Sequence, residues 1–326
     1  MRKVLLLGIG PTTVSALKSL AGKFEIVGIV RDIDPSTERS DEVSELAGNL
    51  GLRIITDTGL DSIEAAIRAG SPDCTVVSSF HRILPSRILG LGRFVNVHYA
   101  PLPAYRGRAN VNWAIVNGEA ETAISIHTIV PGLDAGNILY QERIPIGPSD
   151  TVSDLYTRLN DIQYTVLGDT VTRYLDGYNG VPQDEESATY GCTRLPRDGE
   201  IDWREETTRI FALIRALSPP FPGAHTYLET HRLTVVRAEP LEDAPRYVGR
   251  VPGRIVGRSK SQGHVDVLTG DGVLRIHEVR TEDGRVCPAA TVITSTRQTL
   301  GLSAADLLQR IDDLTARLHE LEKRSP

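Results

Sequence analysis

The chain has 326 residues, of which 40% are hydrophobic and 24% are charged, and its formal net charge is −6. This length allows two domains with cores of their own, and the composition is that of a folded globular protein rather than a disordered one. The negative charge argues against a partner bound mainly through phosphates, as a nucleic acid is, because such binding comes from clustered Lys and Arg.

Strands alternate with helices through the first half of the chain. The hydrophobic runs predict strands at 3–8, 24–32, 52–57, 73–80, 94–99, 122–130 and 137–146. The segments between and after them predict helices at 11–23, 40–51, 59–70, 109–118 and 151–177. This alternation predicts an α/β domain with a doubly wound, mostly parallel, Rossmann-like sheet.

The pattern changes after about residue 180. Residues 183–203 are polar and rich in turn formers, which indicates a linker, and its acidic residues 184–186 are expected to be solvated. One helix is predicted within 207–228, and short strands follow at 231–240, 251–258, 264–272 and 273–280. Their turn-separated spacing is typical of a small β-barrel. We expect a catalytic domain over 1–205 with the linker from about 182, a barrel domain over 206–302 and a helical tail over 303–326.

The tail carries an apolar stripe at alternating steps of four and three. Its members are Leu307, Ile311, Leu314, Leu318 and Leu321. This coiled-coil-like stripe is about two heptads long, which is too short to be stable alone. We expect a homodimer whose contact includes residues 304–322; the alternative is that the stripe folds back onto the barrel of its own chain.

The cysteines and the N-terminal residues indicate the cellular compartment of the protein. Cys74, Cys192 and Cys287 stand far apart without a metal-binding spacing, so neither a disulfide framework nor a zinc site is expected. The N-terminal apolar run stops at Gly8 without a cleavage site, and no apolar run approaches the roughly 20 residues that span a bilayer. These features predict a cytoplasmic protein with no metal and no membrane partner.

A Gly-Ile-Gly turn at Gly8–Gly10 follows the first predicted strand. The dinucleotide-binding fingerprint needs a third glycine three positions later, where Thr13 stands instead. A plain tight turn is therefore preferred, and a nicotinamide-dependent oxidoreductase is kept as the alternative. Because ligands of such sheets bind beyond the carboxyl ends of the strands, Gly10, Pro11 and Thr12 are candidates for substrate contact.

The predicted strand 94–99 carries Asn96 and His98, two positions apart and hence on one face, near its carboxyl end. The pair alone fits a core histidine with a capping asparagine equally well. Asp134, in a glycine-flanked turn between two later strands, favours a catalytic set, because Asn, His and Asp supply an oxyanion donor, a base and a group that orients the base. No serine or cysteine stands as an obvious nucleophile, which indicates acyl transfer onto a substrate amine.

Four segments carry a resemblance to a known family. They are "NVHYAPLPAYRGRANVNWAIVNGE", "SIHTIVPGLDAGNILYQ", "ATYGCTRLPRDGEIDW" and "IRALSPPFPGAHTYL". They resemble the 10-formyltetrahydrofolate-dependent formyltransferases over nearly the whole chain, most of all the sugar N-formyltransferases. The resemblance implies an OB-like fold for the barrel domain and places the catalytic Asn-x-His and Asp of the family on Asn96, His98 and Asp134. The family usually has Ser-Leu-Leu-Pro after the histidine, whereas Ala100–Pro103 lacks the hydroxyl and adds a proline.

The resemblance also implies binding residues and a substrate. It places the formyl donor, 10-formyltetrahydrofolate, against Phe80, Arg82, Ile83, Leu84, Val130, Gly132 and Asp134. It places the acceptor against Tyr105, Arg106, Gly107 and Arg108, although both arginines also fit solvated loop charges. A nucleotide-linked amino sugar is the first choice of acceptor, with methionyl-tRNA and a hydroxylated amino acid of a siderophore pathway as alternatives. A non-catalytic folate-binding protein is a further alternative, and His127 is expected to be structural, facing the rim of the site or solvent.

Overall fold

The computed structural model of the chain describes residues 1–32, 42–302 and 304–324, with side chains except at 304–306 and 320–324. The chain divides into two compact units, one formed by 1–114 and 119–194 and the other by 115–118 and 195–326. None of the helices within the described ranges is long and apolar enough to cross a membrane.

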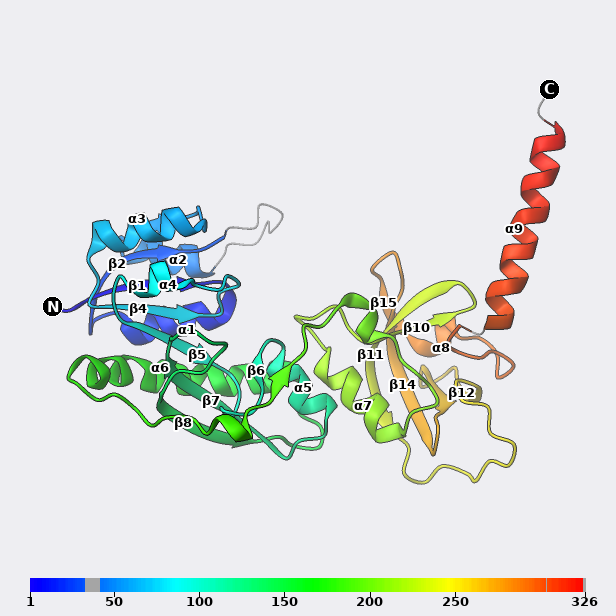
Figure 1. Cartoon of the computed structure of the whole chain (residues 1–326). Coiled ribbons are helices and arrows are strands. Elements are labelled where there is room, and N and C mark those ends of the chain that lie inside the picture. The colour runs from blue at the N-terminus through cyan, green and yellow to red at the C-terminus, as the bar shows by residue number, and fades with distance from the viewer. Residues whose placement is uncertain (33–41, 303, 325–326) are drawn as a thin grey trace. The chain divides into compact units, whose positions relative to one another are not determined.

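A seven-stranded sheet organises the first unit, with the order β3-β2-β1-β4-β5-β7-β8. Its strands are β1 (Lys3–Gly8), β2 (Glu25–Val30), β3 (Ile54–Ile55), β4 (Cys74–Ser78), β5 (Phe94–His98), β7 (Glu121–Thr128) and β8 (Ile138–Pro145). The first five run parallel, whereas β7 is antiparallel to β5 and β8 is antiparallel to β7. The predicted Rossmann-like, mostly parallel sheet is confirmed (Figure 1).

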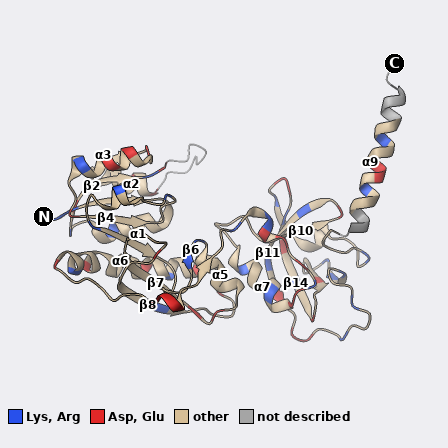
Figure 2. Cartoon of the chain, in the orientation of Figure 1, with Lys and Arg blue, Asp and Glu red and all other residues tan. Residues whose placement is uncertain are grey.

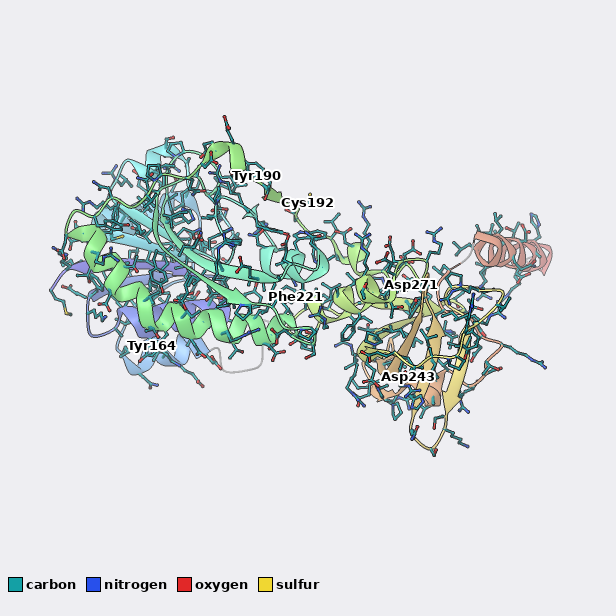
Figure 3. All side chains as sticks on the ribbon, turned by 90° about the horizontal axis from the view of Figure 1, so that it is seen from below. Tyr164, Tyr190, Cys192, Phe221, Asp243 and Asp271 are labelled. Carbon is teal, nitrogen blue, oxygen red and sulfur yellow. The ribbon has the colours of Figure 1, made fainter. Side chains whose placement is uncertain are left out.

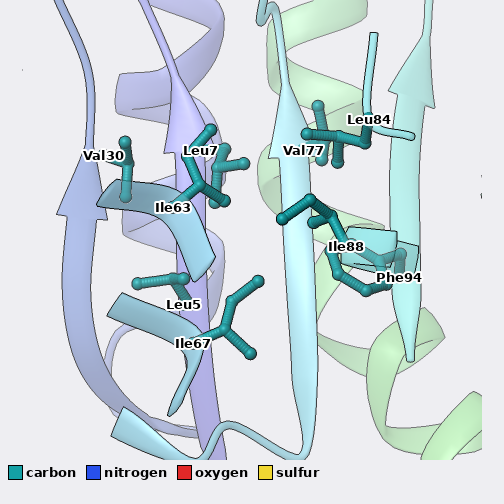
Figure 4. Packing of buried hydrophobic residues seen from close by; sticks show 9 residues of the cluster. All are labelled: Leu5, Leu7, Val30, Ile63, Ile67, Val77, Leu84, Ile88 and Phe94. Carbon is teal, nitrogen blue, oxygen red and sulfur yellow. The ribbon is translucent and has the colours of Figure 1, made fainter. Parts of the chain in front are cut away.

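Helices cover both faces of this sheet. The helices that lie between and after these strands in the chain are α1 (Gly10–Leu20), α2 (Glu42–Asn49), α3 (Leu60–Gly70), α4 (Ser86–Leu89), α5 (Asn110–Val116) and α6 (Val152–Leu175). On one face Ile63 and Ile67 of α3 pack in a buried cluster with Leu5 and Val77 of the strands (Figure 4). On the other face the Gln163 amide of α6 donates to Ser78 Oγ, the neighbour of Val77 on β4. Strand side chains alternate between faces, so this sheet is buried on both sides.

The second unit is built on antiparallel strands. It contains α7 (Thr207–Ala216), β10 (His225–Leu228), β11 (His231–Pro240), β12 (Ile255–Ser259), β13 (His264–Leu268), β14 (Val273–Arg280), β15 (Val286–Pro288) and α8 (Ala289–Val292). The strand order is β10-β11-β14-β13-β12, and β15 pairs with β14.

The predicted OB-like barrel is supported only as an antiparallel sheet domain. The described strands form an open order, and no closed barrel is found among them. Thr299 and Leu300 add isolated bridges to Arg254 and Leu228, so they contact chain near both outer strands of the sheet.

The C-terminal tail is helical, as the sequence predicts. Helix α9 runs from Ala304 to Arg324. Leu307, Ile311, Leu314 and Leu318 of the apolar stripe are 45%, 56%, 50% and 57% exposed. Residue 303 and residues 325–326 of the expected tail lie outside the described residues, as does the side chain of Leu321.

Candidate active site

The carboxyl end of β5 and the neighbouring strand β7 bring four polar side chains together. Asn96 and His98 lie on the same face of β5, and the antiparallel register pairs Asn96 with His127 of β7. Asp134 follows in the turn between β7 and β8. The sequence prediction that Asp134 reaches back to the Asn-His pair agrees with this arrangement.

The distances define a compact, buried cluster. His98 Nδ1 lies 3.7 Å from Asp134 Oδ2, and His127 Nε2 lies 3.6 Å from Asp134 Oδ1. The Asn96 amide nitrogen is 3.1 Å from His127 Nε2 and 3.4 Å from Asp134 Oδ1. The side chains of His98, His127 and Asp134 are only 8%, 2% and 13% exposed. Charges in such a site are poorly screened, so each group strongly affects its neighbours.

The loop that carries Asp134 has an unusual backbone. Asp134 has a φ of 50° and Gly132 a φ of 121°, both in the region that L side chains avoid. The Gly107 N–H donates to Asp134 Oδ2 at 2.8 Å, which ties this loop to the segment after β5. Burial by itself raises the pKa of Asp134, but the contact with His127, the charge of His98 and the Gly107 N–H outweigh it and bring that pKa to about 2. Asp134 is therefore a stable carboxylate.

His98 is held from both ring nitrogens. Its Nε2 lies 2.9 Å from the Tyr105 carbonyl oxygen, while Nδ1 faces Asp134. Burial lowers the pKa of the His98 imidazole below its ordinary value; His127 acts in the same direction, and Asp134 and the Tyr105 carbonyl act against it. A buried imidazole that stays neutral at physiological pH can accept a proton.

His127 is a site residue that the sequence prediction missed. It was expected at the rim or in solvent, but the residue is only 1% exposed. Its Nδ1 lies 2.8 Å from the Thr128 carbonyl oxygen, which can only accept, so Nδ1 carries the proton and Nε2 accepts from the Asn96 amide. Only the register between β5 and β7 reveals this contact.

Arg106 does not line the pocket but is buried at 1% exposure. Its guanidinium donates to both carboxylate oxygens of Glu185, at 2.8 and 2.7 Å, and to the Gln183 amide oxygen at 2.9 Å. The Gln183 amide nitrogen in turn donates to the backbone carbonyls of Asp134 and Gly136. The predicted linker is thus part of the scaffold of the site, and its acidic run is not simply solvated.

Two short strands complete this scaffold. β6 (Arg106–Gly107) pairs in parallel with β9 (Tyr190–Gly191), and the Trp113 indole N–H of α5 donates to the Cys192 carbonyl at 2.8 Å. Figure 3 labels Tyr190 and Cys192 on this segment of the first unit. The loop after β5 is therefore held by chain that follows it by about eighty residues in the sequence.

A cavity of about 740 Å³ opens beside the cluster. Of the predicted site residues, its wall includes Thr12, Phe80, Arg82, Ile83, Leu84, Asn96, His98, Gly107, Arg108, Val130, Gly132 and Asp134. Gly10, Pro11 and Tyr105 are not part of the wall. Three apolar wall residues, Ile83, Leu133 and Val130, are 84%, 49% and 39% exposed. Such apolar surface in a concave site favours a ligand with an apolar part.

Comparison with known proteins connects this geometry to a family. Residues 53–171 match the family described as "Formyl transferase", and residues 195–297 match "Formyl transferase, C-terminal domain". The chain is 31% identical over 296 residues to a methionyl-tRNA formyltransferase of Caldanaerobacter subterraneus subsp. tengcongensis, which covers 87% of this chain and 93% of that protein.

Solved structures of other proteins share the fold, and two of them were determined with a folate bound. HypX from Aquifex aeolicus in complex with tetrahydrofolic acid has a TM-score of 0.65 at 17% identity, over 90% of this chain and 47% of HypX. The present chain thus spans about half the length of that protein. An N-formyltransferase from Helicobacter canadensis, in complex with folinic acid and dTDP-3-aminofucose, has a TM-score of 0.60 at 19% identity, over 85% of this chain and 98% of that protein. At these identities the likeness concerns the fold alone.

Proposed function

The chain belongs to the formyl transferase family, and from that premise we propose that it moves a formyl group from 10-formyltetrahydrofolate to the amine of a nucleotide-linked amino sugar. The observation that carries the proposed reaction is the convergence of Asn96, His98 and Asp134 on the wall of one cavity. The nature of the acceptor rests on the charges around that cavity.

The cavity suits a folate. Phe80, Ile83 and Leu84 lie in one wall segment and Val130 and Gly132 in another, so a flat ring system would be enclosed between apolar groups and backbone. Exposure of Ile83 at 84% leaves a large apolar surface that such a ring would cover. When bound, the folate supplies the formyl group and the nitrogen from which it leaves.

Each residue of the cluster has a distinct part in the proposed transfer. His98 accepts the proton of the attacking amine, and its lowered pKa keeps it unprotonated at neutral pH. Asn96 donates to the formyl oxygen as negative charge builds there; its 3.4 Å contact with Asp134 is long, so that hydrogen can turn to a stronger acceptor. Asp134 remains ionised, orients His98 and stabilises its protonated form.

Arg108 is the residue that we assign to the acceptor. Its side chain is exposed and lines the cavity, two positions from Arg106, whose guanidinium is already engaged by Glu185 and Gln183. A guanidinium on the wall can bind a phosphate in a bidentate manner. Arg108, rather than both arginines, therefore supports the phosphate-bearing part of a nucleotide sugar.

The second unit offers little support for a bound tRNA. From Phe211 to Gln298 there are 12 Lys and Arg against 9 Asp and Glu, and Figure 2 shows both signs interspersed over its elements. Several of these arginines serve the unit itself: Arg258 and Arg280 donate to backbone carbonyls, and Arg275 pairs with Asp266. A tRNA site needs many cations directed at phosphates.

Methionyl-tRNA formyltransferase is the second candidate, because a protein of that name is 31% identical over 296 residues. The two candidates separate in one assay, in which charged initiator tRNA and a panel of UDP- and dTDP-linked amino sugars are offered in parallel with the formyl donor. We expect turnover of a sugar and none of the tRNA. Efficient formylation of the tRNA without turnover of any sugar would refute the proposed acceptor.

The Arg108→Ala variant tests the assignment within the site. We expect the KM for the sugar acceptor to rise roughly tenfold or more, as the loss of one charge-assisted contact implies, with the KM for the folate little changed. Arg237→Ala, which removes an exposed arginine paired with Glu278 in the second unit, is the matched control. Equal effects of both variants on the acceptor KM would speak against Arg108.

We further propose that two copies of the chain associate through α9 in a parallel coiled coil. Ile311 and Leu318 take the a positions of a heptad repeat and Leu307 and Leu314 the d positions. The β-branched Ile311 at an a position with Leu at the d positions favours two parallel strands. All four are about half-exposed on the isolated helix.

The charges beside this stripe disfavour an antiparallel arrangement, which would bring the g-position residues Arg310 and Arg317 of the two copies together. Sedimentation should give a dimer for the wild type and a monomer for Ile311→Asp, with Ala316→Asp on the outer face as control. A wild-type monomer at micromolar concentration would contradict this.

A further inference from the structure

We propose that Asn110 is a positioning residue for His98: its amide N–H, directed at Nε2 of the imidazole, keeps that ring unprotonated and ready to act as a base. The inference rests on the proposed role of His98 in formyl transfer. Asn110 begins α5, is 7% exposed, and belongs to the cavity wall.

The contact with the imidazole is close. Asn110 Nδ2 lies 3.0 Å from His98 Nε2 and 3.2 Å from the Gly107 carbonyl oxygen. A carbonyl oxygen can only accept, so the bond to Gly107 requires the NH₂ end of the amide on this side. The same NH₂ group therefore directs its second hydrogen at His98.

The other end of the amide agrees with this orientation. Asn110 Oδ1 is buried and makes no hydrogen bond within the described residues. It packs against Gly191, where an added Cβ would lie 2.4 Å from Oδ1. The missing side chain at Gly191 thus leaves the room in which the amide sits beside His98.

The electrostatic consequence has a definite sign. An imidazolium carries protons on both nitrogens, so its Nε2–H would face the Asn110 N–H. A neutral ring protonated at Nδ1, the nitrogen that faces Asp134, offers Nε2 as an acceptor instead. The amide therefore favours this neutral tautomer over the imidazolium. The Tyr105 carbonyl, 2.9 Å from the same nitrogen, favours a proton on Nε2. Nε2 thus lies between the Asn110 amide, a donor, and the Tyr105 carbonyl, an acceptor. Removal of the Asn110 donor is expected to favour protonation of Nε2.

The other groups that face His98 explain why such a donor is useful. Asp134, 3.7 Å from Nδ1, favours the imidazolium, and His127, with ring centroids 6.2 Å apart, disfavours it when charged. Asp134 must be an anion to stabilise the imidazolium that forms during transfer. An amide donor at Nε2 offsets the preference of Asp134 for the imidazolium before the reaction. His98 therefore stays unprotonated at neutral pH and can accept a proton.

The test measures the His98 imidazole directly, by NMR titration of the full-length protein, with the signal assigned from a His98→Gln spectrum. Asn110→Leu removes the donor at similar volume, and Asn110→Asp replaces it by a carboxylate. We expect the pKa of His98 to rise by about 0.5 to 1 unit in the leucine variant, the size of one hydrogen bond, and further in the aspartate variant. The acidic limb of kcat/KM should move to higher pH by the same amount.

Asn137→Leu is the matched control. It makes the same substitution at an asparagine whose amide donates to the Asn179 carbonyl at 3.0 Å and that is not part of the cavity wall. We expect it to leave the pKa of His98 unchanged. An unchanged or lowered pKa of His98 in both Asn110 variants would overturn the inference. If one variant does not fold, the pKa measured in the other decides the test. If the pKa of His98 rises in the variants but the wild type formylates no amine, the role of Asn110 is supported and the proposed function is refuted.

Discussion

Each unit of this chain contains two histidines beside a carboxylate, but the two clusters differ in their surroundings. In the first unit the His98 and His127 rings lie 6.2 Å apart, edge to face, with Asp134 next to both. In the second unit the His264 and His277 rings lie 6.0 Å apart in a similar arrangement, and His277 Nε2 is 3.0 Å from Glu239.

The two clusters differ in how deeply the carboxylate is buried. The Asp134 side chain is 13% exposed and lines the cavity, whereas the Glu239 side chain is 55% exposed. A solvated carboxylate is screened by water, whereas the buried Asp134 carboxylate has a pKa of about 2 and interacts strongly with its neighbours. Two histidines and a carboxylate therefore form a buried cluster beside a cavity in the first unit, whereas in the second unit the carboxylate lies largely in solvent.

The largest expected effect comes from removal of the base in the buried cluster. We expect His98→Ala to lower kcat/KM for formyl transfer by about 100- to 10,000-fold while the fold survives, because a positioned general base is lost. His277→Ala is the equivalent change in the cluster of the second unit and should leave turnover within a factor of two or so. Steady-state kinetics with circular dichroism measure both. Near wild-type turnover of a folded His98→Ala protein would show that the buried cluster is no more important for turnover than the cluster of the second unit.

A second test concerns the scaffold that positions the buried cluster. Arg106→Leu leaves Glu185 and Gln183 without their donor and releases the segment that anchors Asp134. We expect a lower melting temperature and a loss of roughly 10- to 100-fold in kcat, since small displacements of catalytic groups are costly. The exposed pair of Arg237 and Glu278 provides the control, because Arg237→Leu should change neither quantity appreciably. An active, stable Arg106→Leu enzyme would show that the anchor is dispensable.

The pH profile gives a smaller and more specific effect. Burial lowers the pKa of His98 below 6.5, so the base is free above that value and is lost as pH falls through the lowered pKa. We expect the acidic limb of kcat/KM to lie below pH 6.5, with Asp134 still ionised because its pKa is about 2. A profile whose acidic limb lies above pH 7 would contradict a base with these surroundings.

The smallest effect is expected for the exposed carboxylate. Glu239→Gln removes the charge beside His277, and we expect the free energy of unfolding to change by no more than about 0.5 kcal/mol, as for most exposed pairs. Chemical denaturation measures this change, and formyl transfer should be unaffected. A loss of activity in Glu239→Gln would indicate that the second cluster contributes to function.

The architecture of the first unit and the proximity of Asn96, His98 and Asp134 were predictable from the amino-acid sequence. Alternation of apolar strands with amphipathic helices is a local signal, so the mostly parallel sheet followed from it. The two-residue repeat of a strand put Asn96 and His98 on one face, and the glycines around Asp134 marked the turn that carries it. The family resemblance rested on the same contiguous segments.

The other side chains that join these three depend on contacts between distant segments of the chain. His127 meets Asn96 through strand register, and Arg106 meets Gln183 across 77 residues of sequence. Asn110 reaches His98 because the loop after β5 folds back and Gly191 leaves room beside it. Such contacts depend on how distant segments approach one another, and no local periodicity encodes that approach. The open order of the second sheet is of the same kind, since strand spacing predicts strands but not whether their edges meet.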